Sequence, residues 1–295
     1  MKFISIVLPT YNRQKKIFSI IKNLNFQRFL NFELIIIDQS EKNLTKIFKK
    51  FKNKKFPVKY IHLDEPGVCY ARNLGVKISK YKYIFFLDDD ITIRDKFFFK
   101  RLFLYLSKNK DTKIIQGQMI EKNRKRMRFK NVNDFSNRFD REVKSINLLI
   151  TGNCIIEKKT FLSVKGFNEL YQGRTFGYED GDLGKRLIKK GFKIKFVPKF
   201  TVYHHNYKKG GNRDNDKSKG LKISLTTRLI TFFQYYGEHF SGLEKFIYYI
   251  SIFRKILRKD YLSVWSFINI PYSIIKAYMI AQSRRKKVFN SIFNV

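Results

Sequence analysis

The sequence predicts an α/β protein with a mixed, mostly parallel sheet flanked by helices, followed by a helical appendage at the C-terminus. Apolar runs of strand length alternate with helix-like stretches along the first part of the chain. This alternation is typical of βαβ units, in which helices cover both faces of a parallel sheet. After residue 220 the pattern changes to aromatic, helical segments.

Length and composition support one main domain with an appendage. The chain has 295 residues, of which 43% are hydrophobic, so it has ample material for a core, which disfavours global disorder. We assign the main domain to residues 1–207 and the helical region to residues 221–295. Residues 208–220, which contain two adjacent glycines and many charged side chains, are the predicted linker.

The predicted strands are rich in Ile, Val, Phe or Tyr and cover residues 3–8, 34–37, 58–63 and 83–87. The helix-like stretches between them cover residues 14–24, 42–50 and 68–79. In open α/β sheets the ligand crevice lies beyond the carboxyl ends of the strands. Polar groups follow three of the strands, so we expect them to converge there: Pro9-Thr10-Tyr11-Asn12, Asp38-Gln39-Ser40 and Asp88-Asp89-Asp90.

The acidic cluster Asp88-Asp89-Asp90 is the most informative of these groups. Unpaired carboxylates repel one another, so a divalent cation is a natural partner, and such an ion can neutralise a diphosphate. The alternative is a solvated acidic turn that caps a helix beginning at residues 92–95. The cluster alone leaves both interpretations open.

A second acidic pair, Glu179-Asp180, opens a predicted helix over residues 180–190 that ends at Gly191. The helix dipole favours carboxylates at this end and keeps them ionised. Simple N-capping of the helix explains one of these two carboxylates equally well. Asp182 and Arg186 are spaced i,i+4 and predict a local ion pair.

Two weaker signals concern a histidine and a glycine. His204 follows a short predicted strand over residues 201–203, and a neutral imidazole can ligate a metal, although a lone histidine is more often structural. Gly152-Asn153 follows an apolar run. The glycine would let the backbone approach a ligand closely, but an ordinary strand bulge explains it as well.

Net charge and cysteine content give expectations about binding partners and the cellular compartment. The net charge of +38 attracts anionic lipid, nucleic acid and phosphorylated substrates, although a general bias toward lysine would produce the same balance. No recognition-helix or aromatic RNA-binding motif supports specific nucleic-acid binding. Cys69 and Cys154 form no CxxC motif, which disfavours a zinc site or disulfide framework and fits a reducing cytoplasm.

The C-terminal region predicts attachment to a membrane surface. Its uncharged run over residues 261–275 is shorter than the ~20 residues needed to span a bilayer. Aromatic residues and flanking basic clusters suit a helix lying on an anionic membrane. The N-terminal apolar run is too short for a signal peptide. We therefore expect a cytoplasmic, peripheral protein on the inner face of the cell membrane. Helices packed on the main domain or on another subunit are the alternative.

Taken in order, these motifs resemble family 2 glycosyltransferases with the GT-A fold over about residues 3–206. The resemblance begins with the opening strand and nucleotide loop and is collinear. Its parts are Ile4-Ser5-Ile6-Val7-Leu8-Pro9-Thr10-Tyr11-Asn12-Arg13, Glu33-Leu34-Ile35-Ile36-Ile37-Asp38-Gln39-Ser40, Ala71-Arg72-Asn73, Asp88-Asp89-Asp90, Gly166-Phe167-Asn168-Glu169, Glu179-Asp180 with Asp182-Leu183 and Arg186, and Pro198 with His204. One departure is Asp38-Gln39-Ser40, where many members have Asp-Asp-Gly-Ser or a similar turn, and this bears on base and sugar preference.

The resemblance implies a role for each matching position. Asp38 would read the nucleobase, and Asp88 would contact the ribose or base. The donor-binding set as a whole is Pro9, Thr10, Tyr11, Asn12, Asp38, Arg72, Asp88 and Asp89. Asp90 and His204 would hold Mg²⁺ or Mn²⁺ on the diphosphate. Asp180 would be the general base, with Glu179 as the second candidate. The acceptor-side residues would be Gly152, Asn153 and Arg186.

The function implied is an inverting glycosyltransferase of cell-surface polysaccharide biosynthesis. It would move a sugar from a nucleotide-diphosphate-sugar donor to a hydroxyl of a glycan or lipid-linked acceptor. A sugar nucleotidyltransferase is the first alternative, but the first strand runs into Pro9-Thr10-Tyr11-Asn12 and not into a glycine-rich loop. A basic nucleic-acid-binding or membrane-binding protein is the second, suggested by charge alone.

Overall fold

The computed structural model describes residues 4–121, 129–130, 137–138, 142–146, 149–169, 179–205, 207 and 275. Its first half alternates strands and helices in the predicted order. These elements are β1 (Ile4–Thr10), α1 (Gln14–Asn25), β2 (Phe32–Asp38), α2 (Thr45–Lys50), β3 (Val58–His62), α3 (Val68–Ile78) and β4 (Tyr83–Leu87). The predicted α/β class is confirmed, and most predicted boundaries lie within a few residues of the observed ones.

The second half is less regular. Its elements are β5 (Ile91–Thr92), α4 (Phe98–Lys108), β6 (Ile114–Glu121), β7 (Phe129–Lys130), β8 (Asn137–Arg138), β9 (Val143–Ile146), β10 (Asn153–Glu157), α5 (Lys158–Ser163), α6 (Glu179–Lys189) and β11 (Ile194–His204). The predicted strand over residues 201–203 is the end of the longer β11. The predicted end of α6 is confirmed by Gly191, whose φ of 89° lies in the left-handed region that glycine adopts most readily.

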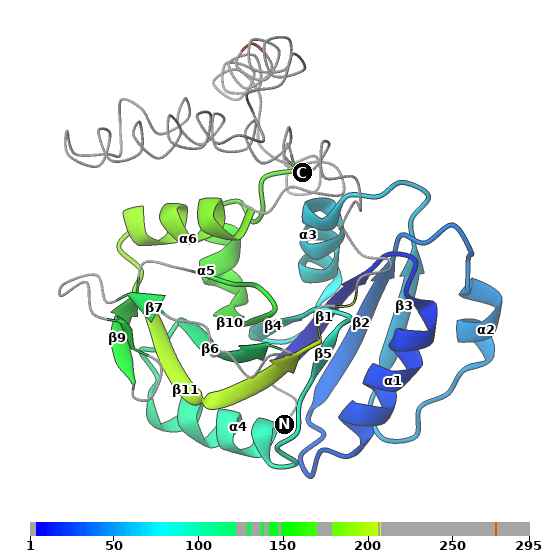
Figure 1. Cartoon of the computed structure of the whole chain (residues 1–295), viewed down its shortest axis with the longest axis horizontal. Helices are drawn as coiled ribbons and strands as arrows, with labels where there is room; N and C mark the ends of the chain where they lie inside the picture. Colours follow the sequence, from blue (N-terminus) through cyan, green and yellow to red (C-terminus); the bar gives the residue numbers. More distant parts are fainter. Residues whose placement is uncertain are drawn as a thin grey trace, which may run out of the picture.

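Within the described residues, nine strands form one mixed sheet (Figure 1) in the order β3-β2-β1-β4-β10-β6-β11-β5, with β9 also paired to β11. Strands β1 to β4 are mutually parallel, and β6 is parallel to β11. Strand β10 runs antiparallel to both β4 and β6, and its pairing places Asn153 opposite Leu87. The segment just before β10 therefore lies beside the acidic residues that follow β4.

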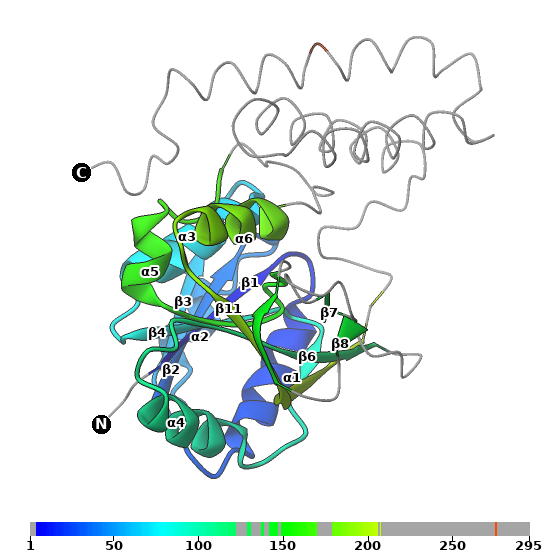
Figure 2. The same cartoon turned by 90° about the vertical axis from the view of Figure 1, so that its left-hand side faces the viewer.

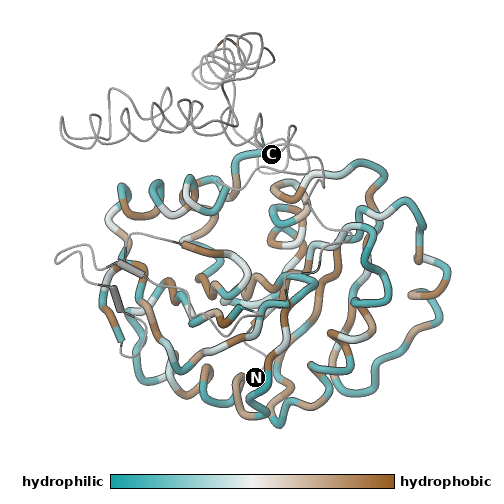
Figure 3. Tube along the Cα trace, in the orientation of Figure 1, coloured by the Kyte–Doolittle hydropathy of each residue, from teal (hydrophilic) through white to brown (hydrophobic). Residues whose placement is uncertain are grey.

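Helices cover both faces of the sheet, as Figure 2 shows. Helices α1 and α4 pack on one face with Phe85 and Leu87 of β4, while α3, α5 and α6 pack on the other with Ile84 and Phe86. Successive side chains of a strand point to opposite faces, so a strand buried on both sides reads as a continuous apolar run. Hydrophobic residues accordingly follow the central strands in Figure 3.

The structure corrects one alternative from the sequence. A helix capped by the acidic cluster at residues 92–95 is wrong, because Ile91–Thr92 forms the short strand β5 paired with β11, and α4 begins only at Phe98. Strand pairing with a distant segment therefore outweighs the local capping pattern. The predicted linker lies outside the described residues, and so does the appendage apart from Ile275.

Candidate active site

The carboxyl ends of β1, β2 and β4 meet at one edge of the sheet, where the polar groups converge as predicted. Thr10 is paired with Asp38 in the register of β1 and β2. Asn12 adopts a φ of 51°, a left-handed conformation that asparagine tolerates better than most residues, and its backbone N–H donates to Ser40 Oγ at 2.8 Å. The loops after β1 and β2 therefore form one continuous unit.

Asp38 is fully buried at the base of this unit. Its carboxylate accepts hydrogen bonds from the Tyr60 hydroxyl at 2.8 Å, from the Ser40 backbone N–H at 2.9 Å and from the Ser40 hydroxyl. Burial, and then the bond to Asp38, raise the pKa of Tyr60 above its usual range, although the Leu44 backbone bond opposes this. These contacts fix the carboxylate that the resemblance assigns to the nucleobase.

The acidic cluster after β4 is largely buried, so the alternative of a solvated turn is wrong. Asp89 and Asp90 are 6% and 5% exposed, whereas the Asp88 side chain keeps 31% of its surface. Asp89 accepts a hydrogen bond from the Thr10 hydroxyl at 2.7 Å. Burial raises the pKa of Asp89 to about 6 even though the Arg13 guanidinium opposes the shift. Asp88 is thus the member most open to a ligand, while Asp89 mainly binds the loop after β1.

Arg13 provides a cation for this cluster, and the sequence analysis assigned it no role. Its Nη1 lies 2.7 Å from Asp89 Oδ1 and 3.2 Å from Asp90 Oδ2, and its Nη2 donates to the Tyr207 carbonyl at 2.9 Å. Burial acts to lower the pKa of Arg13, but the two carboxylates raise it overall. The sequence could have indicated a nearby cation, because two neighbouring carboxylates that become buried need a positive charge to compensate them.

Asp90 and His204 are brought together by the pairing of β5 with β11. Their Oδ1 and Nε2 atoms are 3.1 Å apart. A carboxylate oxygen and an imidazole nitrogen suit Mn²⁺, and Mg²⁺ is usually held by one or two carboxylates together with substrate phosphates. Among the described residues, no group of three or more His, Cys, Asp or Glu is placed to hold a metal ion. Asp90 and His204 would thus supply two ligands, Asp90 is also paired with Arg13, and a metal ion at this position stays a prediction.

Arg72 lies at the centre of the second half of the site. It projects from α3, is 4% exposed, and its guanidinium carbon lies 5.3 Å from the centre of the Phe167 ring. Its Nη2 lies 3.1 Å from Asp88 Oδ1, and its Nη1 lies 3.2 Å from Glu179 Oε1 and 3.7 Å from Asp180 Oδ1. One buried cation therefore joins the acidic cluster after β4 to the acidic pair that opens α6.

Glu179 and Asp180 differ in exposure and partners. The Glu179 side chain is 10% exposed, whereas the Asp180 side chain is 23% exposed. Both Asp180 oxygens accept hydrogen bonds from Thr151, one from its backbone N–H at 3.0 Å and one from its hydroxyl at 2.7 Å. Thr151 was missed by the sequence analysis, since no motif contains it. It fixes the orientation of the more exposed carboxylate.

Burial also shifts the pKa values of this acidic pair. Burial, and next the charge of Asp180, raise the pKa of Glu179 to about 7. Burial raises the pKa of Asp180 as well, against the opposing effects of Arg72 and the Thr151 hydrogen bonds. Desolvation thus opposes the effect of the helix dipole, and ionisation of both groups stays a prediction.

Gly152 lies in the turn before β10 and not in a bulge within the strand. A Cβ at this position would lie 2.7 Å from Met119 Cε, 2.9 Å from Asp88 Oδ2 and 3.1 Å from Ile91 Cδ1. The absent side chain thus lets the backbone pass directly beside the acidic cluster. A larger residue would displace Asp88.

The two other acceptor-side candidates make contacts within the protein. Asn153 is fully buried, and its Nδ2 donates to the carbonyls of Gln118 at 2.9 Å and Phe200 at 2.8 Å, where the pairing of β11 with β6 shifts register. The predicted local pair is confirmed, with Arg186 Nη2 2.7 Å from Asp182 Oδ2. Contact of Asn153 or Arg186 with an acceptor stays a prediction.

Comparison with protein families gives two matches along the chain. The model described as "Glycosyl transferase family 2" matches residues 5–167. The model described as "N-terminal domain of galactosyltransferase" matches residues 138–209. Together they cover the segments that carry both acidic motifs and His204.

Curated relatives share parts of this sequence. An uncharacterised glycosyltransferase of Rickettsia conorii is 42% identical over 98 residues, which are 32% of this chain and 16% of that protein. Chondroitin synthase of Pasteurella multocida is 25% identical over 259 residues, which are 75% of this chain and 26% of that protein. Poly(ribitol-phosphate) β-N-acetylglucosaminyltransferase TarP of Staphylococcus aureus is 31% identical over 100 residues, which are 32% of this chain and 31% of that protein. The match thus spans less than a third of each of these relatives.

Among solved structures, residues 1–349 of S. aureus TarS in complex with UDP-GlcNAc superpose with a TM-score of 0.62. The match covers 96% of this chain and 92% of that one at 15% sequence identity. The likeness shows the fold, which is of the GT-A type that the sequence resemblance implied.

Replacing Arg72 with methionine should strongly destabilise the fold. Methionine keeps an apolar stem but leaves Asp88, Glu179 and Asp180 without their shared cation, and breaking a buried ion pair in this way costs about 3 kcal/mol or more. Burial already raises the folded-state pKa values of Glu179 and Asp180 above the unfolded values of about 4, and without the opposing charge of Arg72 they rise further. The loss of unfolding free energy should therefore be small near pH 4 and grow as the pH rises to 8.

Urea unfolding at pH 5 and pH 8 measures this effect. The matched control is Arg101→Met, because Arg101 pairs with Asp95 but is 55% exposed, and such surface pairs are worth about 0–1 kcal/mol. A pH-independent loss, or one no larger than that of the control, would contradict the role given to Arg72.

Proposed function

The chain belongs to glycosyltransferase family 2, and from this premise we propose that it is an inverting enzyme that uses a nucleotide-diphosphate-sugar donor. The sugar would pass to a hydroxyl of a glycan or lipid-linked acceptor in cell-surface polysaccharide biosynthesis. The observation that carries the proposal is the junction at Arg72, which places the acidic cluster after β4 and the acidic pair of α6 around one guanidinium. The UDP-GlcNAc bound by TarS supports a nucleotide-sugar donor. The family membership leaves the nucleotidyltransferase alternative without support.

Donor binding would use the edge where the loops after β1 and β2 meet. Asp38, held by Tyr60 and Ser40, would face the nucleobase beside the loop of residues 9–12. Asp88, the most exposed of the three aspartates, would contact the ribose. Asp90 and His204 would hold Mg²⁺ or Mn²⁺, and the bound ion would offset the charge of the departing diphosphate.

The acceptor hydroxyl would lose its proton to Asp180. This carboxylate is the more exposed of the acidic pair, and Thr151 holds it in one orientation. A general base works best when its pKa lies near the working pH, and burial shifts the pair in that direction. The oxygen would then attack the anomeric carbon in one displacement, which inverts the configuration without a covalent sugar–enzyme intermediate. Glu179, bound to Arg72, would mainly orient that cation.

Asp90→Asn should abolish metal-dependent donor binding while leaving the fold intact. The substitution keeps the shape of the side chain but removes the charge that would face the cation beside His204. In a thermal-shift assay with UDP and Mn²⁺, the wild type should gain stability, by about 2.7 kcal/mol at a ligand concentration of 100 times Kd. The variant should show no extra gain from Mn²⁺ and no transfer. Near-normal, metal-stimulated turnover by Asp90→Asn would reject this assignment.

Asp180→Asn should still bind donor but lose about 10²–10⁴-fold in kcat, the usual contribution of a general base. Because the base must be unprotonated, kcat/KM of the wild type should fall as the pH is lowered, and burial, which raises the pKa of Asp180, should place this fall at a higher pH than for an ordinary aspartate. The residual activity of the variant should lack this dependence.

Glu179→Gln is the matched control for the general base. It should retain most of the wild-type kcat. An active Asp180→Asn together with an inactive Glu179→Gln would exchange the two roles. Activity in both variants would reject the mechanism.

We propose peripheral attachment to the membrane through residues 221–295. None of the helices in the described part of the chain is both long and apolar enough to cross a bilayer. Each basic residue near an anionic surface contributes about 1 kcal/mol, so the flanking basic clusters would hold the protein reversibly. Full-length protein should sediment with anionic liposomes and be partly released by high salt, whereas a version ending near Gly220 should not sediment. Equal behaviour of the two proteins would contradict the proposal.

A further inference from the structure

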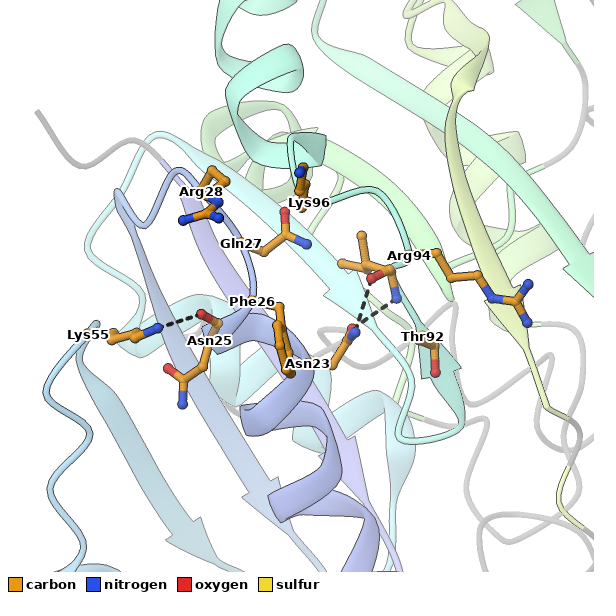
Figure 4. A pocket seen from close by; sticks show the side chains of 10 residues that line it. Asn23, Asn25, Phe26, Gln27, Arg28, Lys55, Thr92, Arg94 and Lys96 are labelled. Atoms are coloured by element: carbon orange, nitrogen blue, oxygen red, sulfur yellow. Dashed lines mark hydrogen bonds between the residues drawn. The ribbon is translucent and has the colours of Figure 1, made fainter.

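A pocket opens outside the residues assigned to the active site (Figure 4). It lies between the last turn of α1 with the residues that follow it (23–28), Lys55 before β3, and the segment from β5 toward α4 (residues 92–96), and its volume is about 430 Å³. This volume lies within the range of about 300–1,000 Å³ that is typical of small-ligand sites. Polar and cationic side chains predominate in the lining. More of the exposed lining surface is nevertheless apolar, so the pocket suits a ligand that combines polar groups with an apolar face.

Two buried oxygens in this pocket lack hydrogen-bond donors within the described part of the chain. Gln27 is 4% exposed, and its Nε2 donates to the Asp95 carbonyl at 3.0 Å. This bond fixes the orientation of the amide and leaves Oε1 without a hydrogen-bond partner. The Oδ1 of Asn25 also has no hydrogen-bond partner. A buried unsatisfied acceptor costs about 1–3 kcal/mol, so a ligand that brings hydroxyl donors gains by satisfying it. Both oxygens have almost no accessible surface, so neighbouring side chains must move before a ligand hydroxyl reaches them.

The rim of the pocket is positively charged. Arg28, Lys55 and Lys96 are exposed there, and no aspartate or glutamate lines the pocket. Lys55 Nζ donates to the Asn25 carbonyl at 2.9 Å, which holds one cation over the pocket (Figure 4). Arg94 points toward β11, where its guanidinium carbon lies 3.8 Å from the centre of the Tyr203 ring. The three remaining cations favour a ligand that carries an anionic group.

Phe26 adds an apolar surface beside these polar groups. It is 66% exposed, the largest exposure given for any bulky hydrophobic residue in the described part of the chain. An exposed ring of this kind can pack against the C–H face of a sugar, while the hydroxyls of the sugar reach nearby acceptors. Hydroxyl acceptors, an aromatic platform and basic side chains are thus combined within one pocket.

We propose that this pocket is an accessory binding site for an acidic oligosaccharide. Sugar hydroxyls donate to the Gln27 and Asn25 oxygens, the ring packs on Phe26, and carboxylates bind Lys55 and Lys96. The choice of a saccharide over another anion rests on the proposed function. Single-stranded nucleic acid is the competing ligand, since it also combines rings with negative charge.

The pocket is connected to the candidate metal site through a short path. Thr92 lines the pocket, and its hydroxyl oxygen lies 2.7 Å from His205 Nε2. The His205 backbone N–H donates to the Asp90 carbonyl at 2.8 Å, and His205 follows His204 directly. Thr92 and His205 thus link the pocket to the loop after β4, while residues 23–28 and Lys55 lie at the amino ends of β2 and β3, at the opposite edge of the sheet from the transfer chemistry.

Isothermal titration of the full chain at physiological salt, without donor or metal, tests the proposal. The probes are tetragalacturonate, its fully methyl-esterified and therefore uncharged form, and a tetranucleotide. Tetragalacturonate should bind, and the ester at least tenfold more weakly. Phe26→Ala and the double variant Lys55→Ala/Lys96→Ala should each weaken binding of the acid by about tenfold, which corresponds to about 1.4 kcal/mol. All three positions are exposed, so unchanged melting temperatures should verify folding.

The double variant Lys49→Ala/Lys50→Ala is the charge-matched control, because these lysines are exposed on α2 outside the pocket. It should change affinity less than twofold. Equal weakening by both lysine pairs, equal binding of the ester, or tighter binding of the tetranucleotide at the same residues would overturn the proposal. If tetragalacturonate fails to bind while UDP with Mn²⁺ still stabilises the protein, the accessory site is rejected and the proposed function stands. Binding of tetragalacturonate without any nucleotide effect supports the pocket and counts against the proposed function.

Discussion

The burial of several carboxylates at one edge of the sheet is the constraint on which the rest of the site depends. Desolvated carboxylates are tolerated only where cations and hydrogen-bond donors compensate them. Two arginines meet this need from opposite sides. Arg13 binds Asp89 and Asp90, while Arg72 binds Asp88 together with the acidic pair of α6. In the cluster after β4, Asp89 and Asp90 are thereby bound to the loop after β1, while Asp88 faces α6.

The antiparallel strand β10 supplies the second half of this arrangement. In a purely parallel sheet the segment next to β4 would enter from the opposite edge. Because β10 runs the other way, Thr151 and Gly152 lie immediately before its first residue and beside the end of β4. Thr151 then orients Asp180, and Gly152 leaves room for Asp88. One reversed strand thus positions groups that belong to two different acidic motifs.

The electrostatic character of the molecule complements this chemistry. The protein carries a net charge of +38, yet its candidate active site is a concentration of carboxylates. A positive field around the molecule raises the local concentration of anionic ligands, whereas the carboxylates at the candidate site are compensated by Arg13 and Arg72. The basic rim near Lys55 and Lys96 has no such carboxylates lining it, so it favours anions directly. The same overall charge therefore has different consequences at the two places.

The sequence by itself determined the features that depend on local pattern. Alternating apolar runs predicted the βαβ order, the acidic strand end at Asp88 marked the edge of the sheet, and i,i+4 spacing predicted the Asp182–Arg186 pair. Each of these features follows from residues close together in the chain, where strand length, helix period and dipole apply directly. The ordered set of motifs extended this local information to the family.

Only the tertiary structure decided which charges meet. Arg13 lies 76 positions from Asp89, and Arg72 lies 107 positions from Glu179, so no local spacing could pair them. The assembly of the sheet also sets the direction of β10 and the burial that raises the pKa of Glu179. It likewise brings Thr151 within hydrogen-bond distance of Asp180. Desolvation and ion pairing act on distances in space, and the fold sets those distances between segments that the sequence leaves far apart.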